Sequence, residues 1–217
     1  FSIKREKELY EDINHDLRTP LMVISTSIEL LKSGELSSYQ IEKLDMIDEN
    51  SNKMKNLINE LLFLNKNIIS TNEEIEINIQ DFLKNIVHNF SIIGNKKGVL
   101  INLETKSNFI LKTNPLILDK LFGNIIKNAI SYTNEGNINI IVEKNKISIK
   151  DTGIGIEKED LNNIWNRFYR VEKSRNNKNG GFGLGLSIVK RIIEENNWKI
   201  EINSKIGIGT EFIIYFD

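Results

Sequence analysis

Asp151 begins a short turn whose residue types could hold a flat polar ligand. The turn, Asp151-Thr-Gly-Ile-Gly-Ile156, follows the alternating run Ile147-Ser-Ile-Lys150, which is typical of a strand. Gly153 and Gly155 allow the backbone to turn tightly and to approach a ligand closely. The Asp151 carboxylate can accept a hydrogen bond from an exocyclic amine such as N6 of adenine. Since an Asp-x-Gly turn after a strand is usually only a turn, other segments must decide its role.

A second glycine-containing segment, Gly180-Gly-Phe-Gly-Leu-Gly-Leu186, leads directly into an apolar helical pattern. Backbone N–H groups at the start of such a helix can face phosphate oxygens. The helix dipole contributes only ~0.3–1 kcal/mol to holding a surface anion, so a metal ion and cations must share the charge of a triphosphate. Lys173, Arg175 and Lys178, in the preceding Asn-rich loop, are plausible cations. We expect this loop to be a lid that orders on nucleotide.

Asn124 and Asn128 are four residues apart in a helical pattern, so their amides share one face. Two surface asparagines explain this spacing about as well as a binding site does. In the binding interpretation one amide oxygen ligates Mg²⁺, which prefers oxygen and is often shared with phosphate. Two other nucleotide motifs are excluded: no strand leads into the second glycine segment, as a Rossmann turn requires, and no Gly-Lys-Ser/Thr follows, as a P-loop requires.

His15 is the residue that could accept a phosphoryl group. It is two residues from both Ile13 and Leu17, which places it ~160–200° from the apolar stripe of its helix and toward solvent. Pro20 follows one turn later, and within a helix it costs ~3 kcal/mol if uncompensated, a cost that structure alone does not explain. A neutral imidazole carries a lone pair that can attack a γ-phosphate directly. His88 lies opposite Ile86 and Phe90 and is interpreted as a surface residue.

The elements that position these residues fall into two halves, with a hairpin over 1–67, a linker over 68–73 and a second domain over 74–217. Two long amphipathic helices in the first half cannot bury both apolar stripes in one hairpin, so we expect a homodimeric four-helix bundle. The stripes are Leu9, Ile13, Leu17, Leu21, Ile24, Ile28 and Leu31, and then Ile41, Leu44, Ile47, Met54, Leu57, Ile58, Leu61, Leu62 and Leu64.

The second half mixes strands and helices, which favours a two-layer α/β sandwich and an α+β chain overall. Ile75, Ile77 and Ile79 alternate as a strand, and Asn114-Pro115 is typical of a helix start. We expect helices over 82–93, 114–132 and 184–196, and further strands over 99–103, 109–112, 137–142, 145–150, 198–203 and 210–216.

Composition excludes several classes of function. The 217 residues have a formal net charge of -1, which gives no support for a nucleic-acid partner. The absence of cysteine excludes disulfides and thiolate metal sites, and two histidines make a zinc site improbable. No apolar run approaches the roughly 20 residues that span a bilayer.

Taken together, the motifs resemble those of bacterial sensor histidine kinases, in that family's order along nearly the whole chain. Asn124 and Asn128 resemble its N box, Asp151-x-Gly153-x-Gly155 its G1 box, and Gly181-x-Gly183-x-Gly185 its G2 box. Phe168-Tyr-Arg170 is similar to the F box, His15-Asp-Leu-Arg-Thr-Pro20 to the H box, and Gly207-Ile-Gly209-Thr210 to the last glycine motif.

The resemblance implies a Bergerat-type ATP-binding fold with ATP and Mg²⁺ as ligands, Asp151 contacting adenine N6 and Asn128 ligating the metal. It implies that His15 is phosphorylated from ATP, that Asp16 orients its imidazole, and that Thr19 positions water to dephosphorylate a response regulator. The remaining implied nucleotide contacts are Tyr132, Ile156, Leu184 and Leu186 around the base and ribose, with Phe168, Arg170, Lys173, Arg175, Gly181, Gly183, Gly185 and Thr210.

The same resemblance implies the partners. They are a second copy of the chain and a response-regulator receiver domain whose aspartate takes the phosphoryl group. The chain is expected to be the cytoplasmic portion of a membrane sensor kinase, with contact to the membrane only through an N-terminal sensor region that this sequence lacks.

Two alternatives stay open. Hydrolases and serine kinases with the same ATP fold carry a Glu where this chain has Asn124, and an amide cannot act as the general base that activates water. A degenerate kinase that serves as a dimeric binding scaffold is the other alternative. It rests on Ser131, which stands where many family members carry Lys or Arg, although Lys127 or a cation of the lid could substitute.

Overall fold

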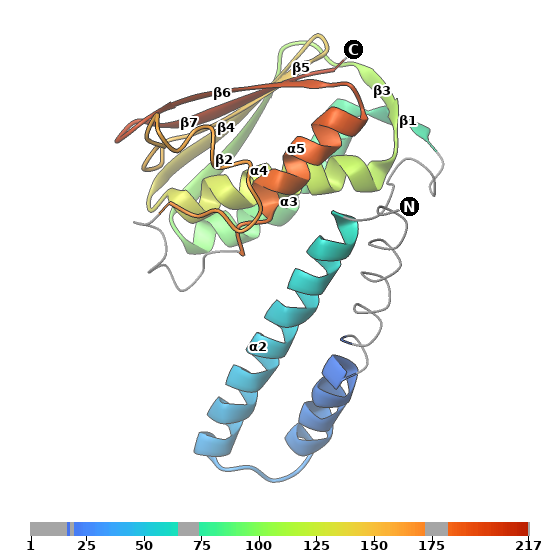
Figure 1. Cartoon of the computed structure of the whole chain (residues 1–217), viewed down its shortest axis with the longest axis vertical. Coiled ribbons are helices and arrows are strands. Elements are labelled where there is room, and N and C mark those ends of the chain that lie inside the picture. The colour runs from blue at the N-terminus through green and yellow to red at the C-terminus, as the bar shows by residue number, and fades with distance from the viewer. Residues whose placement is uncertain (1–16, 18–19, 65–73, 172–181, 217) are drawn as a thin grey trace, which may run out of the picture. The chain divides into compact units, whose positions relative to one another are not determined.

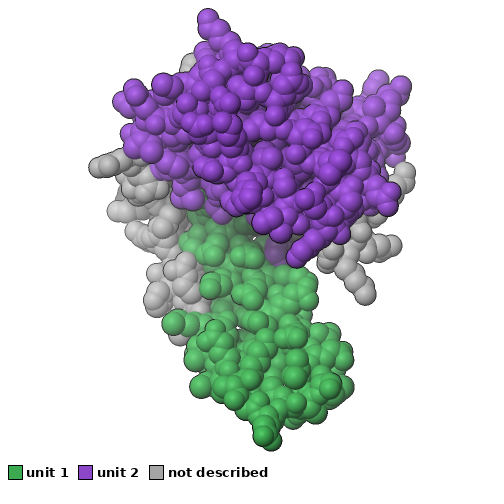
Figure 2. Space-filling view, turned by 180° about the vertical axis from the view of Figure 1, so that it is seen from behind, with its two compact units in different colours: residues 1–67 green, residues 68–217 purple. Residues whose placement is uncertain are grey.

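The computed structural model describes residues 17, 20–64, 74–171 and 182–216. The chain divides into two units, Phe1–Asn67 and Ile68–Asp217 (Figure 2), and each is described by itself. Among the described helices, none is long and apolar enough to cross a membrane.

The first unit contains a helix over residues 20–32 and the longer helix α2 (Ser38–Phe63). Ser37 fixes the start of α2 through a capping box, as its hydroxyl accepts from the Gln40 backbone N–H at 3.4 Å. In return the Gln40 side chain accepts from the Ser37 backbone N–H at 2.9 Å. These bonds satisfy N–H groups that a helix start otherwise leaves unpaired, which explains why the helix begins at this point.

The hairpin buries only part of its expected stripes. Leu21, Ile28, Leu44 and Ile58 are buried, and Ser51 lies among the buried residues of α2. Other stripe residues stay 38–55% exposed in the single chain: Leu17, Ile24, Leu31, Ile41, Ile47 and Met54. One hairpin therefore leaves a row of apolar side chains without cover, as the two-stripe argument predicts.

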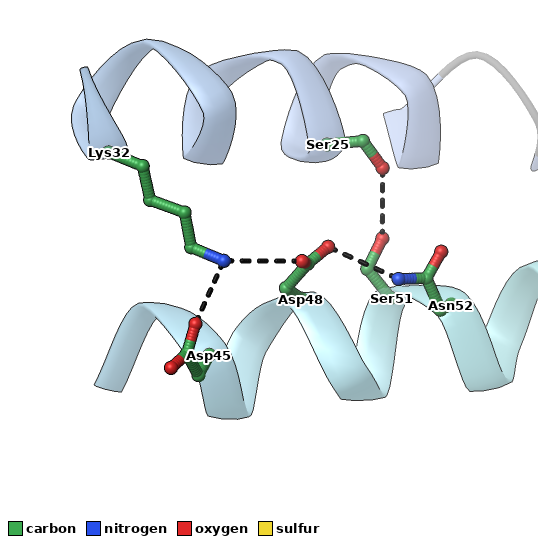
Figure 3. Close-up of polar contacts among 6 residues, drawn as sticks. All are labelled: Ser25, Lys32, Asp45, Asp48, Ser51 and Asn52. Carbon is green, nitrogen blue, oxygen red and sulfur yellow. Dashed lines mark hydrogen bonds and ion pairs between the residues drawn. The ribbon is translucent and has the colours of Figure 1, made fainter. Parts of the chain in front are cut away.

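Polar contacts join the two helices of the hairpin along one side (Figure 3). The Lys32 Nζ lies 2.9 Å from an Asp45 carboxylate oxygen and 3.3 Å from one of Asp48. The hydroxyls of Ser25 and Ser51 are 3.5 Å apart. The hydrogen bond to Asp45 raises the pKa of Lys32, so this pairing favours the charged ammonium. Exposed ion pairs contribute little to stability, so they fix the pairing of the helices more than they hold them together.

The second unit is built on a five-stranded sheet in the order β2-β4-β5-β7-β6. Its strands are β2 (Val99–Thr105), β4 (Gly136–Glu143), β5 (Lys146–Asp151), β6 (Lys199–Lys205) and β7 (Gly209–Tyr215). The pair β2·β4 is parallel and the other pairs are antiparallel. Two shorter strands, β1 (Ile75–Asn78) and β3 (Ile110–Thr113), form a separate antiparallel pair.

Three helices cover one face of this sheet, as Figure 1 shows, and they are α3 (Ile79–Lys96), α4 (Pro115–Tyr132) and α5 (Gly185–Glu195). Alternate residues of the central strands are fully buried toward them, including Ile138, Ile140 and Ile147. The α+β class and the two-layer sandwich predicted from the sequence are confirmed.

The boundary predicted between the first strand and the first helix of this unit is wrong, and that helix, expected over 82–93, runs over Ile79–Lys96. The alternation of Ile75, Ile77 and Ile79 predicts that all three lie in a strand, but α3 already begins at Ile79, which is fully buried. Asn78 ends the strand because its side chain accepts from the Asp81 backbone N–H at 3.2 Å and caps the helix. The helix start predicted at Asn114-Pro115 is confirmed, with the Asn114 side chain accepting from the Leu116 N–H at 2.8 Å.

Candidate nucleotide-binding site

Asp151 is the last residue of β5 and its side chain is only 6% exposed. Its Oδ1 accepts hydrogen bonds from the backbone N–H groups of Gly153, at 2.8 Å, and of Thr210, at 3.2 Å. Burial raises the pKa of Asp151, and these two bonds only partly offset it. Both of these bonds use Oδ1. No other described residue donates a hydrogen bond to Oδ2, so this oxygen can accept one from a ligand.

The two glycines of the turn allow backbone segments to pack against each other. A Cβ on Gly153 would lie 2.5 Å from the Tyr132 carbonyl oxygen, and Gly155 has φ 72° with its Cβ position overlapping the Lys205 carbonyl. The Ile154 N–H donates to that Tyr132 oxygen at 3.1 Å, and the Gly207 N–H donates to the Ile154 oxygen at 2.9 Å. The turn is thus tied to the end of α4 on one side and to the β6–β7 connection on the other.

Ser204 is a site residue that the sequence analysis missed. Its hydroxyl accepts from the Ile156 N–H at 2.8 Å, donates to the Gly209 carbonyl at 3.1 Å, and lies 2.8 Å from the Thr210 hydroxyl. A serine in a short polar strand carries no signal of this role. Only its position three residues before Gly207-Ile-Gly209 could have drawn attention to it.

The start of α5 lies against Asn124 of α4. A Cβ on Gly185 would be 2.9 Å from Oδ1 of Asn124, so this glycine permits the close approach of the two helices. Asn124 donates through Nδ2 to the Lys120 carbonyl at 2.7 Å, which directs its amide oxygen toward α5. Asn128 follows one turn later and is half-buried. The N-box and G2-type residues, some 60 positions apart in the sequence, therefore meet in the fold.

Phe168 and Gly183 are joined directly. The Phe168 N–H donates to the Gly183 carbonyl at 2.9 Å, and Phe168 itself has φ 64° and is 57% exposed. A Cβ on Gly183 would lie 2.8 Å from the Tyr169 carbonyl oxygen. Arg170 is half-buried, as is Leu186, whereas Leu184 is fully buried at the start of α5. The structure thus brings the segment similar to the F box into contact with the segment similar to the G2 box. Leu184 lies in the core and not at the surface of a pocket.

Lys97 is a second residue that the sequence analysis missed. Its Nζ donates to the carbonyl oxygens of Ile130, at 2.7 Å, and Ser131, at 2.8 Å, at the C-terminal end of α4. Burial lowers its pKa. Lys127, a candidate to replace the cation that many family members carry at the position of Ser131, is exposed on α4. The described cation nearest to the Ser131 backbone is therefore Lys97, whose ammonium is bound to the carbonyl oxygens at the end of α4.

Several expected residues lie outside the described part of the chain. These are His15, Asp16, Thr19, Lys173, Arg175, Lys178 and Gly181. Within the described part, no three His, Cys, Asp or Glu side chains form a group that could hold a metal ion, so a metal here would depend on amide oxygens and phosphate.

Comparison with protein families gives two matches, one in each half of the chain. Residues 5–67 match the His Kinase A (phospho-acceptor) domain. Residues 113–217 match the histidine kinase-, DNA gyrase B- and HSP90-like ATPase family.

Among curated relatives, the signal transduction histidine-protein kinase ArlS of Staphylococcus aureus (strain USA300) is 36% identical over 225 residues, which cover 99% of this chain and 49% of ArlS. The chain thus spans about half the length of the curated relatives it matches.

Among solved structures, full-length ShkA in complex with AMPPNP has a TM-score of 0.83 at 22% identity, covering 95% of this chain and 45% of ShkA. The Acinetobacter baumannii histidine kinase AdeS has a TM-score of 0.63 at 19% identity, covering 93% and 97%. With both family matches in the same order as the two units, the chain belongs to the sensor histidine kinases, of which it carries the phosphoacceptor and ATP-binding regions.

Proposed function

We propose that this protein autophosphorylates on His15 with the γ-phosphoryl group of ATP and then transfers that group to an aspartate of a response-regulator receiver domain. The observation that carries this proposal is that α4 joins two parts of the site: the Asp151 turn bonds to the Tyr132 carbonyl at the end of α4, and Gly185 of α5 lies against Asn124. Only Asp151 among these carries a charge, and it is held by backbone N–H groups rather than by a cation. A buried acceptor with one oxygen left over suits the exocyclic amine of adenine.

The other residues of the site would contact either ATP or Mg²⁺. We infer that the base lies against Asp151, Ile156 and Thr210, and that the phosphates face the N-terminus of α5. Tyr132, Leu186, Phe168 and Arg170 would line the rest of the site, with Gly153, Gly155, Gly181, Gly183 and Gly185 shaping its backbone. Lys173 and Arg175 would supply charge, while the buried Leu184 would support the site from the core. AMPPNP is an ATP analogue, and its presence in the ShkA structure supports a nucleotide at this fold.

Asn128 is the proposed ligand of Mg²⁺. Its side chain is half-buried on α4, and an amide oxygen is a ligand that Mg²⁺ accepts alongside phosphate oxygens. Bound there, the ion would neutralise charge on the phosphates as the γ-phosphoryl group leaves. Asn124 would support this position, since the bond to Lys120 fixes the direction of its amide.

His15 would attack as the neutral imidazole. The ring nitrogen forms a bond to the γ-phosphorus while the bond to the bridging oxygen breaks and ADP departs. Asp16 would hold the other ring nitrogen in its protonated form. The regulator's aspartate would then displace the imidazole. In the separate dephosphorylating activity, Thr19 would position a water that hydrolyses the regulator's aspartyl phosphate to aspartate and inorganic phosphate.

The surrounding organisation follows from this reaction. We propose residues 1–67 as the dimerisation and phosphoacceptor hairpin, 68–73 as a linker, and 74–217 as the catalytic domain. The exposed stripe residues of the hairpin support a homodimeric four-helix bundle, because a second copy would cover them. We further propose that the chain is the cytoplasmic portion of a longer membrane sensor kinase.

The most direct test incubates the chain with γ-labelled ATP and Mg²⁺. We expect an acid-labile, base-stable label on the protein that disappears in His15→Gln, because a phosphoramidate has these stabilities. Release of free phosphate without labelled protein would refute the proposal and favour a hydrolase. That alternative has little support here, since Asn124 offers no carboxylate to take a proton from water.

A further inference from the structure

The Ser204 hydroxyl lies in the middle of three polar contacts. It is half-buried near the end of β6, with the Ile156 N–H at 2.8 Å, the Gly209 carbonyl oxygen at 3.1 Å and the Thr210 Oγ1 at 2.8 Å. A serine hydroxyl has one hydrogen to donate and two lone pairs that accept. Three contacts therefore use its whole hydrogen-bonding capacity.

This capacity fixes the direction of each bond. A backbone N–H can only donate, so Ser204 accepts from Ile156, and a carbonyl can only accept, so Ser204 gives its one hydrogen to Gly209. The contact with Thr210 is then made only if the Thr210 hydroxyl donates. With its hydrogen directed to Ser204, the Thr210 hydroxyl presents lone pairs to its other neighbours and acts there as an acceptor.

The same contacts join the two segments that frame Asp151. Ile156 ends the turn that Asp151 begins, and Thr210 is the residue whose backbone N–H binds Asp151 Oδ1 at 3.2 Å. A shift of Ile156 or Thr210 would therefore change where the Asp151 carboxylate is held. Ser204 is the side chain that bonds to both of these residues at once.

We propose that Ser204 is a positioning residue for purine recognition, which holds Asp151 in place and turns the Thr210 hydroxyl into an acceptor. Two acceptors suit a purine with an amine at C6, as in adenine, and oppose one with a carbonyl there, as in guanine. This inference rests on the proposed function, in that Asp151 is taken as the contact to the base.

The test measures the dissociation constants of ADP and GDP for the whole chain and for two variants. Ser204→Ala removes the hydroxyl, while Ser204→Cys nearly keeps its volume and replaces it with a weak donor and acceptor. Ser148→Ala is the matched control. Ser148 is a buried serine on β5, three residues before Asp151 and so on the opposite face of the sheet. Thermal unfolding of each variant gives the folded fraction to which the binding is normalised.

We expect both Ser204 variants to bind ADP about tenfold more weakly, which corresponds to the loss of one net hydrogen bond's contribution. The preference for ADP over GDP should fall by a similar factor, while the Ser148→Ala protein keeps both values. A loss of folded protein with unchanged preference per folded molecule would show a merely structural role and overturn the proposal, as would unchanged ADP binding. Because the assay involves no phosphoryl transfer, a chain that binds ADP in this way but never labels His15 would refute the proposed function alone.

Discussion

At the scale of single residues, Asp151 is the clearest case of a group kept for function at a cost to the fold. Burial raises its pKa despite two backbone hydrogen bonds, so the charged form is less favourable here than in the unfolded chain. An Asn at the same position would keep one acceptor oxygen without the buried charge. The carboxylate is therefore explained by its ligand more readily than by the stability of the apo protein.

Asp151→Asn should separate binding from stability. We expect nucleotide affinity to fall on the order of 10–100-fold, as for the loss of a charged hydrogen bond. Since the folded pKa of Asp151 is raised, the wild type gains stability below its unfolded pKa and loses it as pH rises through the folded pKa. The apo variant should lack this loss and be at least as stable at neutral pH. Denaturant titrations at several pH values check this, and a marked destabilisation of the apo variant at neutral pH would contradict it.

At the scale of elements, the turn after β5 is defined by how closely it packs against its neighbours. Gly155 and Gly207 have nearly equal φ values, 72° and 75°, and lie on segments joined by the bond between Ile154 and Gly207. They differ in their surroundings: a Cβ on Gly155 would overlap the Lys205 carbonyl, and one on Gly207 would meet nothing within 4 Å. This pair separates backbone strain from steric overlap.

Gly155→Ala should therefore be more destabilising than Gly207→Ala. Strain alone costs about 1–2 kcal/mol at a left-handed residue, and this is what we expect for Gly207→Ala. The overlap at Gly155 should add to it and weaken nucleotide binding as well. Unfolding in urea can be followed by tryptophan fluorescence, which reports on the second unit because Trp165 and Trp198 both lie there. Equal losses in the two variants would show that packing at Gly155 is unimportant.

Lys97 provides a test of the end of α4. Its bonds to the Ile130 and Ser131 carbonyls satisfy acceptors that a helix end leaves unpaired. Lys97→Ala should lower the free energy of unfolding by about 1–2 kcal/mol. It should also weaken nucleotide binding, because the adjacent Tyr132 carbonyl holds the Asp151 turn. Lys96→Ala, at an exposed neighbour, is the control and should change neither; a similar effect of both variants would argue against a specific cap.

At the scale of the whole molecule, the hairpin and the second unit differ in how completely they bury their apolar residues. The second unit has a closed core between sheet and helices, with Phe122, Ile126 and Ile140 fully buried. The hairpin leaves much of its two stripes exposed. This contrast indicates that the hairpin needs a second copy, whereas the catalytic unit does not.

Ile47→Asp tests this contrast. Ile47 is 49% exposed in the single chain, and a carboxylate buried between two copies would be strongly unfavourable. We expect sedimentation to give a dimer for the native chain and half that mass for the variant. Leu100→Asp, at a residue of β2 that is 58% exposed, should remain dimeric. An Ile47→Asp protein that stays dimeric at micromolar concentration would place the interface elsewhere.

The class of the fold and most of its elements could be predicted from the sequence, because they depend on local periodicity and capping. The stripe of α4, its Asn114 cap and Pro115 start, and the alternation in β4 and β5 all act within a few residues. The same locality explains the error at Ile79, where an alternating pattern continued past Asn78 although that side chain caps a helix. Motif spacing further pointed to Asp151, Asn124 and Gly185 as parts of one site.

The contacts that hold these parts in place could be found only in the folded structure. Gly185 touches Asn124, Lys97 binds the end of α4, and Ser204 bridges Ile156 and Thr210. These contacts join positions 33 to 61 residues apart or residues on adjacent strands. No local pattern encodes them, because Lys97 and Ser204 have the sequence surroundings of ordinary surface residues. Their roles arise where the sheet and helices bring unpaired carbonyl and N–H groups within hydrogen-bonding reach, and that is a property of the folded chain alone.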